Sequence, residues 1–159
     1  MIKNKDIIIG IICILIIIIL MLSAWLIKDK KKEEYNRHVP KLNIIREKLN
    51  KMLPYLSEDR RKKIARIKLQ PDIKSYTINK HHVHLCLKDP KEPKMEKYYD
   101  NNILIYVTLH ELAHIFCDEI GHTKKFFNIF NELIEIATHV KIYDPSIPLP
   151  KKYCGVKIP

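Results

Sequence analysis

The stretch YVTLHELAHIFCDEIGH, residues Tyr106–His122, decides the fold because it places two histidines and a glutamate inside a mostly apolar segment. His110 and His114 are four residues apart, so on a helix their imidazoles lie one turn apart on one face and can bind one metal ion. Glu111 projects about 100° around the same helix, where it can take a proton from a metal-activated water. The pattern therefore predicts a zinc-binding helix, with Zn²⁺ as cofactor.

The apolar character of this helix supports the zinc prediction. Its apolar residues fall on every side, which is typical of a central, buried helix. Ionisable groups buried there without partners would be costly, and a zinc ion removes that cost by binding the histidines and attracting the carboxylate. The alternative, a chance H-E-x-x-H pattern on a surface helix, conflicts with the apolar surroundings. Gly121 predicts the end of the helix.

Two residues compete as the third metal ligand. His122 follows Gly121, which permits the chain to reverse and bring the next side chain back toward the first two histidines. Glu132 belongs to a second helix, expected over about residues 123–141, and NELIE resembles the second-helix glutamate of other H-E-x-x-H peptidases. Either an imidazole or a carboxylate suits zinc.

Helical geometry favours the histidine. At about 100° per residue, Glu132 falls on the polar side of the second helix, far from the apolar face that contains Phe126. To reach the metal, it would have to turn the lysines of that helix inward. We therefore expect His122 to be the third ligand. Asp118 and Glu119 are weaker candidates because they would point away from the histidines.

A strand is expected before the active-site helix. Apolar and polar side chains alternate there, and the apolar ones are Val83, Leu85 and Leu87. This half-buried strand should pair with Tyr76–Ile78 across a turn near Asn79–Lys80. His82 and His84 form an H-x-H on its other face. A metal site is conceivable there, but we interpret them as solvent-facing histidines.

Two amphipathic helices are expected earlier in the chain. The first spans Leu42–Leu53 and stops at Pro54, which cannot continue a helix. Ser57, followed by two acidic residues, is a helix N-cap and starts the second, which Pro71 closes.

Two segments lack a regular pattern. Residues 90–102 are expected to form a loop with at most a short strand near Met95–Tyr98, after which Asp100 or Asn101 caps the active-site helix. The tail, residues 143–159, contains four prolines and is expected to lie extended over the surface.

The N-terminal block Ile7–Ile27 contains no charged residue. At about 1.5 Å per residue it reaches about 31 Å, the thickness of a bilayer core. A cleaved signal peptide is the alternative, but its apolar region is usually about 7–15 residues, and here apolar residues continue past the possible cleavage site at Leu22–Ala24. Lysines are more numerous after the block, so the positive-inside rule predicts a single-pass membrane protein whose C-terminal domain faces the cytoplasm or the virion interior.

Charge and cysteines suggest partners and a compartment. The net charge is +11, but the lysines are spread out, and the one clear run, Lys28–Lys32, points to lipid headgroups of the bilayer. Nucleic acid is a possible partner that this pattern does not favour. Outside the apolar block, Cys86, Cys117 and Cys154 are far apart, which favours free thiols in a reducing compartment.

The H-E-x-x-H motif and the residues that follow it resemble a known protein family. HELAH, followed after six residues by GHTKKFFNIFNEL, resembles the minimal zincin peptidases of the WLM and SprT/Spartan group. In that group a bend carries a third histidine, and the next helix opens with H-x-x-x-F, here His122 and Phe126. HVHLCLKD is similar to the strand before the active-site helix in WLM domains, so the resemblance covers about residues 75–137. The chain is also similar to compact WLM-like proteins of large DNA viruses.

The resemblance implies a zinc-dependent peptidase. His110, His114 and His122 match the family's metal ligands, and Glu111 matches its general base, which takes a proton from the attacking water and passes it to the leaving amine. Many family members act on proteins crosslinked to DNA and carry DNA-binding tails. A membrane span in place of such a tail departs from that pattern.

We therefore expect an α+β protein: a zincin-like core with a small sheet, an H-E-x-x-H helix and a C-terminal helix, after a transmembrane helix. The expected parts are an anchor (1–27), a basic juxtamembrane linker (28–41), a metallopeptidase domain (42–142) and an extended tail (143–159). The expected function is hydrolysis of a protein or peptide substrate, with Tyr143 and Tyr153 as candidate oxyanion stabilisers. The alternatives are a non-enzymatic zinc-containing membrane or virion protein, and a DNA-associated protease of the WLM/SprT type.

Overall fold

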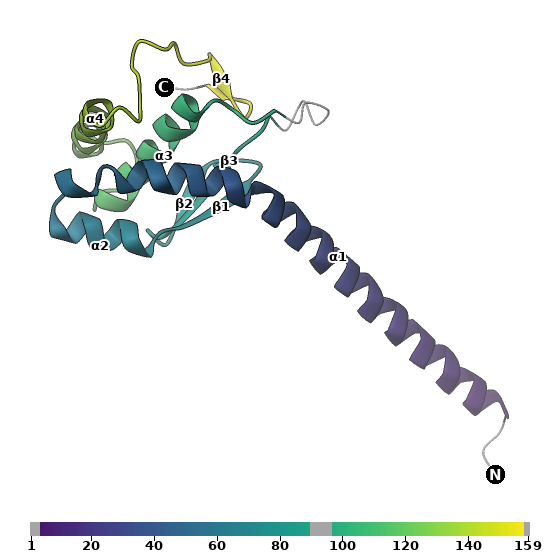
Figure 1. The fold of residues 1–159 in the computed structure, drawn as a ribbon. Helices are drawn as coiled ribbons and strands as arrows, with labels where there is room; N and C mark the ends of the chain where they lie inside the picture. Colours follow the sequence, from purple (N-terminus) through teal and green to yellow (C-terminus); the bar gives the residue numbers. More distant parts are fainter. Residues whose placement is uncertain (1–3, 90–96, 158–159) are drawn as a thin grey trace. The chain divides into compact units, whose positions relative to one another are not determined.

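Helix α1, Asn4–Asn50, begins in the apolar N-terminal block and continues into the folded domain. The computed structural model describes residues 4–89 and 97–157. It divides the chain into two units, Met1–Arg37 and His38–Pro159, and α1 runs through the boundary between them. In Figure 1, α1 is coloured from purple to dark blue.

The first unit consists of the apolar part of α1 and a charged part that follows it. Within the described residues, α1 is the one helix long and apolar enough to cross a membrane, and a signal sequence would meet the same criteria. Residues 28–41, expected as a basic juxtamembrane linker, are part of this helix. Lysine and glutamate, which are frequent in this segment, have high helix propensity.

The first helices of the second unit follow the predicted pattern. The end of α1 buries Leu42, Ile45 and Leu49 at helical spacing. A short 3-10 helix, η1 (Leu53–Tyr55), contains the proline that ends the pattern. Helix α2, Glu58–Arg66, starts after Ser57, whose side chain accepts a hydrogen bond from the backbone of Arg60, as expected for an N-cap.

A three-stranded sheet follows, in the order β1-β3-β2. Its strands are β1 (Lys68–Asp72), β2 (Tyr76–Ile78) and β3 (His82–Cys86), with β1 parallel and β2 antiparallel to β3. The β2–β3 hairpin is confirmed, and its turn residues, Asn79 and Lys80, have the positive φ angles of 50° and 53° that a tight hairpin turn needs.

Strand β1 was missed. Its first residues were expected to be the end of the helix that starts at Ser57, with Pro71 closing that segment. Pro71 instead lies within β1 and pairs with Leu85. A proline can be accommodated there because β1 is an edge strand, where one side of the backbone needs no ladder partner.

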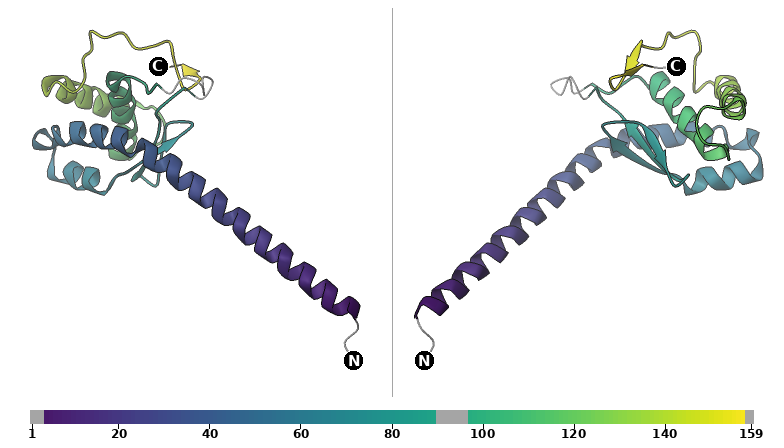
Figure 2. Two further views of the ribbon diagram at one scale, coloured as in Figure 1. Left: turned by 45° about the vertical axis from the view of Figure 1, so that its right-hand side comes forward. Right: turned by 180° about the vertical axis from the view of Figure 1, so that it is seen from behind.

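Helices α3, Asn101–Phe116, and α4, Lys124–His139, complete the core. Asp100 caps α3 and Thr123 caps α4 through their side chains. Helix α3 ends five residues before Gly121, so that glycine is not its cap; with φ of 84° it bends the connecting loop instead. Figures 1 and 2 show α3 between the sheet and α4, and α3 contacts both.

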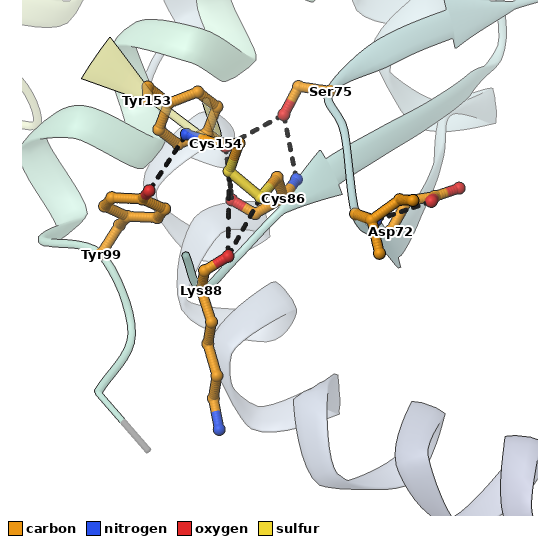
Figure 3. The surroundings of a disulfide bond; sticks show 8 residues. Asp72, Ser75, Cys86, Lys88, Tyr99, Tyr153 and Cys154 are labelled. Atoms are coloured by element: carbon orange, nitrogen blue, oxygen red, sulfur yellow. Dashed lines mark hydrogen bonds between the residues drawn. A yellow bond between two sulfur atoms is a disulfide. The ribbon is translucent and has the colours of Figure 1, made fainter. Parts of the chain in front are cut away.

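The tail is more ordered than expected. It forms a small hairpin of β4, Lys152–Tyr153, and β5, Val156–Lys157. A disulfide joins Cys86 at the end of β3 to Cys154 in the hairpin turn, so the prediction of free thiols was wrong for these two cysteines (Figure 3). Sixty-eight positions separate them, a distance at which spacing carries no pairing information. Residues 95 and 96 of the possible short strand near 95–98 lie outside the described residues, and no strand occurs at residues 97–100.

Candidate metal centre

Three histidines from two parts of the chain meet at one point. His110 and His114 come from α3, and His122 comes from the loop between α3 and α4. One ring nitrogen from each lies within 4.8 Å of the others. The Nε2 atoms of His110 and His122 are 3.0 Å apart. In the part of the chain that the structure describes, this is the one group of three or more His, Cys, Asp or Glu side chains with a spacing suited to a metal.

An aromatic ring forms the floor of the cluster. Phe126, in the first turn of α4, is fully buried, and its ring centroid lies 5.0, 4.4 and 4.7 Å from those of His110, His114 and His122. The N-cap at Thr123 starts α4 directly after the loop and thereby places Phe126 under the imidazoles. Phe126 therefore covers the cluster on one side with an apolar ring that offers the imidazoles no hydrogen-bonding group.

Burial favours the neutral form of the two histidines on α3. It lowers the pKa of His110 to about 4, and the neighbouring His114 and His122 lower that pKa further. The pKa of His114 is lowered by burial and by His122. A neutral imidazole has a free lone pair, the form that binds metals. A set of three histidines fits zinc, which in catalytic sites takes three protein ligands and keeps one position open.

Glu111 lies on the same turn of α3 and is only 5% exposed. Burial raises the pKa of its carboxyl to about 7, and a hydrogen bond from Thr77 acts in the opposite direction. That bond runs from the Thr77 hydroxyl in β2 to Glu111 Oε2, at 2.8 Å. A carboxyl group whose pKa is near neutrality is well matched to accepting and returning a proton.

The competing ligand Glu132 is occupied elsewhere. Its carboxylate forms an ion pair with Arg60 of α2, at 2.5 Å. The opposite face of α4 is buried and contains Phe126, Ile129, Phe130, Leu133 and Ala137. The helical projection therefore placed Glu132 correctly on the side that faces away from the histidines.

Mutants of the two candidate ligands should differ sharply. We expect His122→Ala to weaken zinc binding by more than about 100-fold, because even second-sphere partners of metal ligands contribute about 10- to 100-fold. Glu132→Ala should leave the zinc affinity within about threefold of wild type, since its ion pair is with Arg60. Competition with a fluorescent zinc chelator measures both affinities. The reverse ranking would assign the third ligand to α4.

The remaining candidates contact residues other than the three histidines. His84 Nδ1 donates to the Asp72 carboxylate at 3.0 Å, and its ring stacks on Tyr76, so this part of β3 belongs to a small polar network. Tyr153 is held on the disulfide side of the sheet, where its hydroxyl donates to the carbonyl of Cys86. Tyr143 is buried beside Tyr106. No hydrogen bond joins either candidate oxyanion stabiliser to the three histidines.

Thr77 is the residue of this site that sequence reasoning missed. It lies 34 positions before Glu111, within a three-residue strand. The sequence did predict that Thr77 belongs to a strand, because Tyr76–Ile78 was expected to pair in the hairpin. The sequence contains no signal for which residue of α3 it would contact.

Three viral proteins resemble this chain. It is 45% identical over 123 residues to the uncharacterized protein 136R of Invertebrate iridescent virus 6, covering 77% of this chain and 67% of that protein. It is 43% identical over 90 residues to protein 042R of Invertebrate iridescent virus 3, covering 57% of this chain and 55% of that protein. It is 38% identical over 125 residues to protein R325 of Acanthamoeba polyphaga mimivirus, covering 72% of this chain and 61% of that protein. The chain therefore spans only 55–67% of the length of these relatives. No family model and no solved structure matches it.

Proposed function

Because this chain belongs to the family of viral proteins that includes protein 136R of Invertebrate iridescent virus 6, and because three of its histidines meet beside a buried glutamate, we propose that it is a membrane-anchored zinc metallopeptidase of the WLM and SprT/Spartan type. The observation that supports the proposal most directly is the cluster of His110, His114 and His122 next to Glu111. A structural zinc site has no need of a general base.

The proposed chemistry follows from the roles that the side chains can take. A zinc ion held by the three imidazoles would supply Lewis acidity, which polarises a peptide carbonyl and makes water a stronger nucleophile at neutral pH. Glu111 would accept the proton of the attacking water and then donate it to the leaving amine. The buried floor at Phe126 lowers the local polarity, and electrostatic interactions are stronger in such surroundings.

The edge of the sheet suggests an extended polypeptide as the substrate. Strand β2 pairs with β3 on one side and is an edge strand of the described sheet. Tyr76 and Ile78, on either side of Thr77, are 37% and 43% exposed. An extended peptide can add to such an edge through backbone hydrogen bonds. Bound there, it would lie along the strand whose central residue contacts Glu111.

We propose that the apolar block is retained as an anchor, since it continues into the domain as part of one helix. The lysines after the block favour the cytoplasmic side, whereas the disulfide between Cys86 and Cys154 favours an oxidising environment. Both are satisfied if the domain is made on the cytoplasmic side and is enclosed in a virion. There, away from cytosolic reductants, the two thiols would lose two protons and two electrons to an oxidant such as dissolved oxygen and form the disulfide.

Zinc analysis paired with a cleavage assay tests the proposal. We expect the full-length protein, purified in detergent, to contain about one zinc per chain and to cut fluorescein-labelled casein. 1,10-Phenanthroline should abolish cleavage, and added zinc should restore it. Zinc without cleavage of casein or of the chain itself would favour the non-enzymatic alternative, and a protein without zinc would remove the proposed metal centre.

A further inference from the structure

Among the described residues, the hydrogen bonds between β2 and α3 come from a single hydroxyl group. Thr77 Oγ1 is 2.8 Å from Glu111 Oε2 and 3.4 Å from the backbone carbonyl of Glu111. A hydroxyl has one hydrogen, and the shorter distance together with the carboxylate acceptor makes the side-chain bond the stronger of the two. Thr77 therefore binds one carboxylate oxygen of the proposed general base.

The other carboxylate oxygen of Glu111 is left open. No hydrogen bond to Oε1 occurs among the described residues, and no buried side-chain oxygen or nitrogen there lacks a partner. Since Glu111 is a buried residue, Oε1 must be the part of its carboxylate that keeps access to solvent. The two oxygens thus have different environments: Thr77 holds one, and the other is available to a water molecule.

Thr77 is itself held firmly. As a β-branched residue it has few side-chain rotamers, and its backbone pairs with Val83 in the β2–β3 ladder. Two positions earlier, Ser75 belongs to a closed ring of hydrogen bonds. The Cys86 amide donates to Ser75 Oγ at 3.0 Å, and the Tyr153 hydroxyl donates to the Cys86 carbonyl at 2.5 Å. Because that uses the one hydrogen of Tyr153, Ser75 is the donor across the remaining 2.9 Å (Figure 3).

We propose that Thr77 is the positioning residue for the general base: its hydroxyl holds Oε2 of Glu111 so that Oε1 stays free to take a proton. Tyr153 of the disulfide-linked tail is hydrogen-bonded to Ser75, the residue just before β2. The β4–β5 hairpin thus supports the position of Thr77. This inference rests on the proposed function. It assigns to Thr77, in the edge strand β2, the orientation of the Glu111 carboxylate.

Replacement of the hydroxyl group tests this role in the full-length zinc-loaded protein. Thr77→Val is nearly isosteric and cannot donate, whereas Thr77→Ser keeps the donor. Thr138→Val is the matched control, because Thr138 donates only to the Ile134 carbonyl within α4. Acetohydroxamate is a useful probe, since it chelates zinc and shares a proton with a neighbouring carboxylate. Its dissociation constant reports the orientation of Glu111 without any substrate.

We expect Thr77→Val to keep its zinc and its melting temperature, to bind acetohydroxamate about 10-fold more weakly and to cleave casein about 10- to 100-fold more slowly. Thr77→Ser should recover most of both losses, and Thr138→Val should match wild type. Thr77→Ala provides a second variant without the hydroxyl, should the valine disturb packing, and must give the same result.

Two outcomes would overturn the proposal. One is wild-type affinity for acetohydroxamate in both variants that lack the hydroxyl. The other is an equal loss of zinc and thermal stability in Thr77→Val and Thr77→Ser, which would indicate a purely structural residue. If wild type binds zinc and acetohydroxamate but leaves casein intact, the peptidase proposal fails, while the acetohydroxamate comparison still decides the role of Thr77.

Discussion

Glu111→Gln should abolish peptide hydrolysis while leaving the zinc and the fold in place. The amide is nearly isosteric, and its carbonyl oxygen can still accept the hydrogen bond from Thr77. It cannot accept a proton from water, so we expect the rate to fall by about 10²- to 10⁴-fold, the usual contribution of a general base. The initial rate of casein cleavage, measured at equal zinc content, gives the effect directly.

The stability of the same variant provides an independent readout. In the metal-free protein, burial raises the pKa of Glu111 to about 7, above its ordinary value of 4.5. The folded state therefore holds this proton more tightly than the unfolded state, and ionisation costs stability as the pH rises through that interval. A neutral glutamine carries no such cost. The free energy of unfolding of metal-free Glu111→Gln should thus increase relative to wild type as the pH rises from 5 to 8. The size of the pKa shift sets the size of that increase.

A matched control separates the general base from other glutamates. Glu135 lies exposed on α4, so Glu135→Gln makes the same chemical change without touching the cluster. It should cleave casein at the wild-type rate and show no such pH-dependent gain in stability. Wild-type activity in Glu111→Gln would show that another group takes the proton.

Loss of the disulfide should have the largest effect on stability. The bond joins residues separated by 68 positions, and in the chain-entropy model a loop of that size stabilises the folded protein by about 4 kcal/mol. We expect Cys86→Ala and Cys154→Ala each to lower the free energy of unfolding by about 2–5 kcal/mol. Urea titration read by pulse proteolysis of the domain measures this change.

The double variant makes the disulfide test sharper. Because both single substitutions break the same bond, Cys86→Ala/Cys154→Ala should lose little more than either one alone. Cys13→Ala should have no effect on the domain, since Cys13 is a free, exposed cysteine of α1. Dithiothreitol should lower the urea midpoint of wild type to that of the double variant. An unchanged midpoint would mean that the two sulfurs are not bonded in solution.

The redox state of the two cysteines also reports the compartment. Alkylation of intact samples should modify Cys86 and Cys154 in the cytosol of the producing cell and leave them protected in a released particle. Protection already in the producing cell would place the domain on the oxidising side of the membrane, against the lysine pattern.

Much of the site could be predicted from the sequence because its information is local. The spacing of His110 and His114 requires only the pitch of a helix. The polar position of Glu132 on α4 follows from the same periodicity, and its ion pair with Arg60 agrees with it. The caps at Ser57 and Asp100 were likewise readable, since a side chain that satisfies free backbone amides acts over two or three residues.

The wrong predictions concern features that local sequence patterns do not determine. Strand β1 was missed because Pro71 was taken as the end of a helical segment, whereas an edge strand tolerates a proline. The early end of α3 belongs here too. Gly121 permitted a bend, but the helix stops at Phe116.

The sequence by itself determined the helix with its two histidines, the glutamate beside them, the β2–β3 hairpin and the uncharged N-terminal block. Each of these depends on residues close together in the chain. The sequence also predicted that His122 comes back to the other two histidines, which lie within reach of it in the structure. Only the tertiary structure decided that Thr77 holds Glu111 across 34 positions and that Cys86 bonds to Cys154 across 68. Such contacts depend on how whole elements pack, and packing is set by the combined shape of many side chains, which short spacings do not encode.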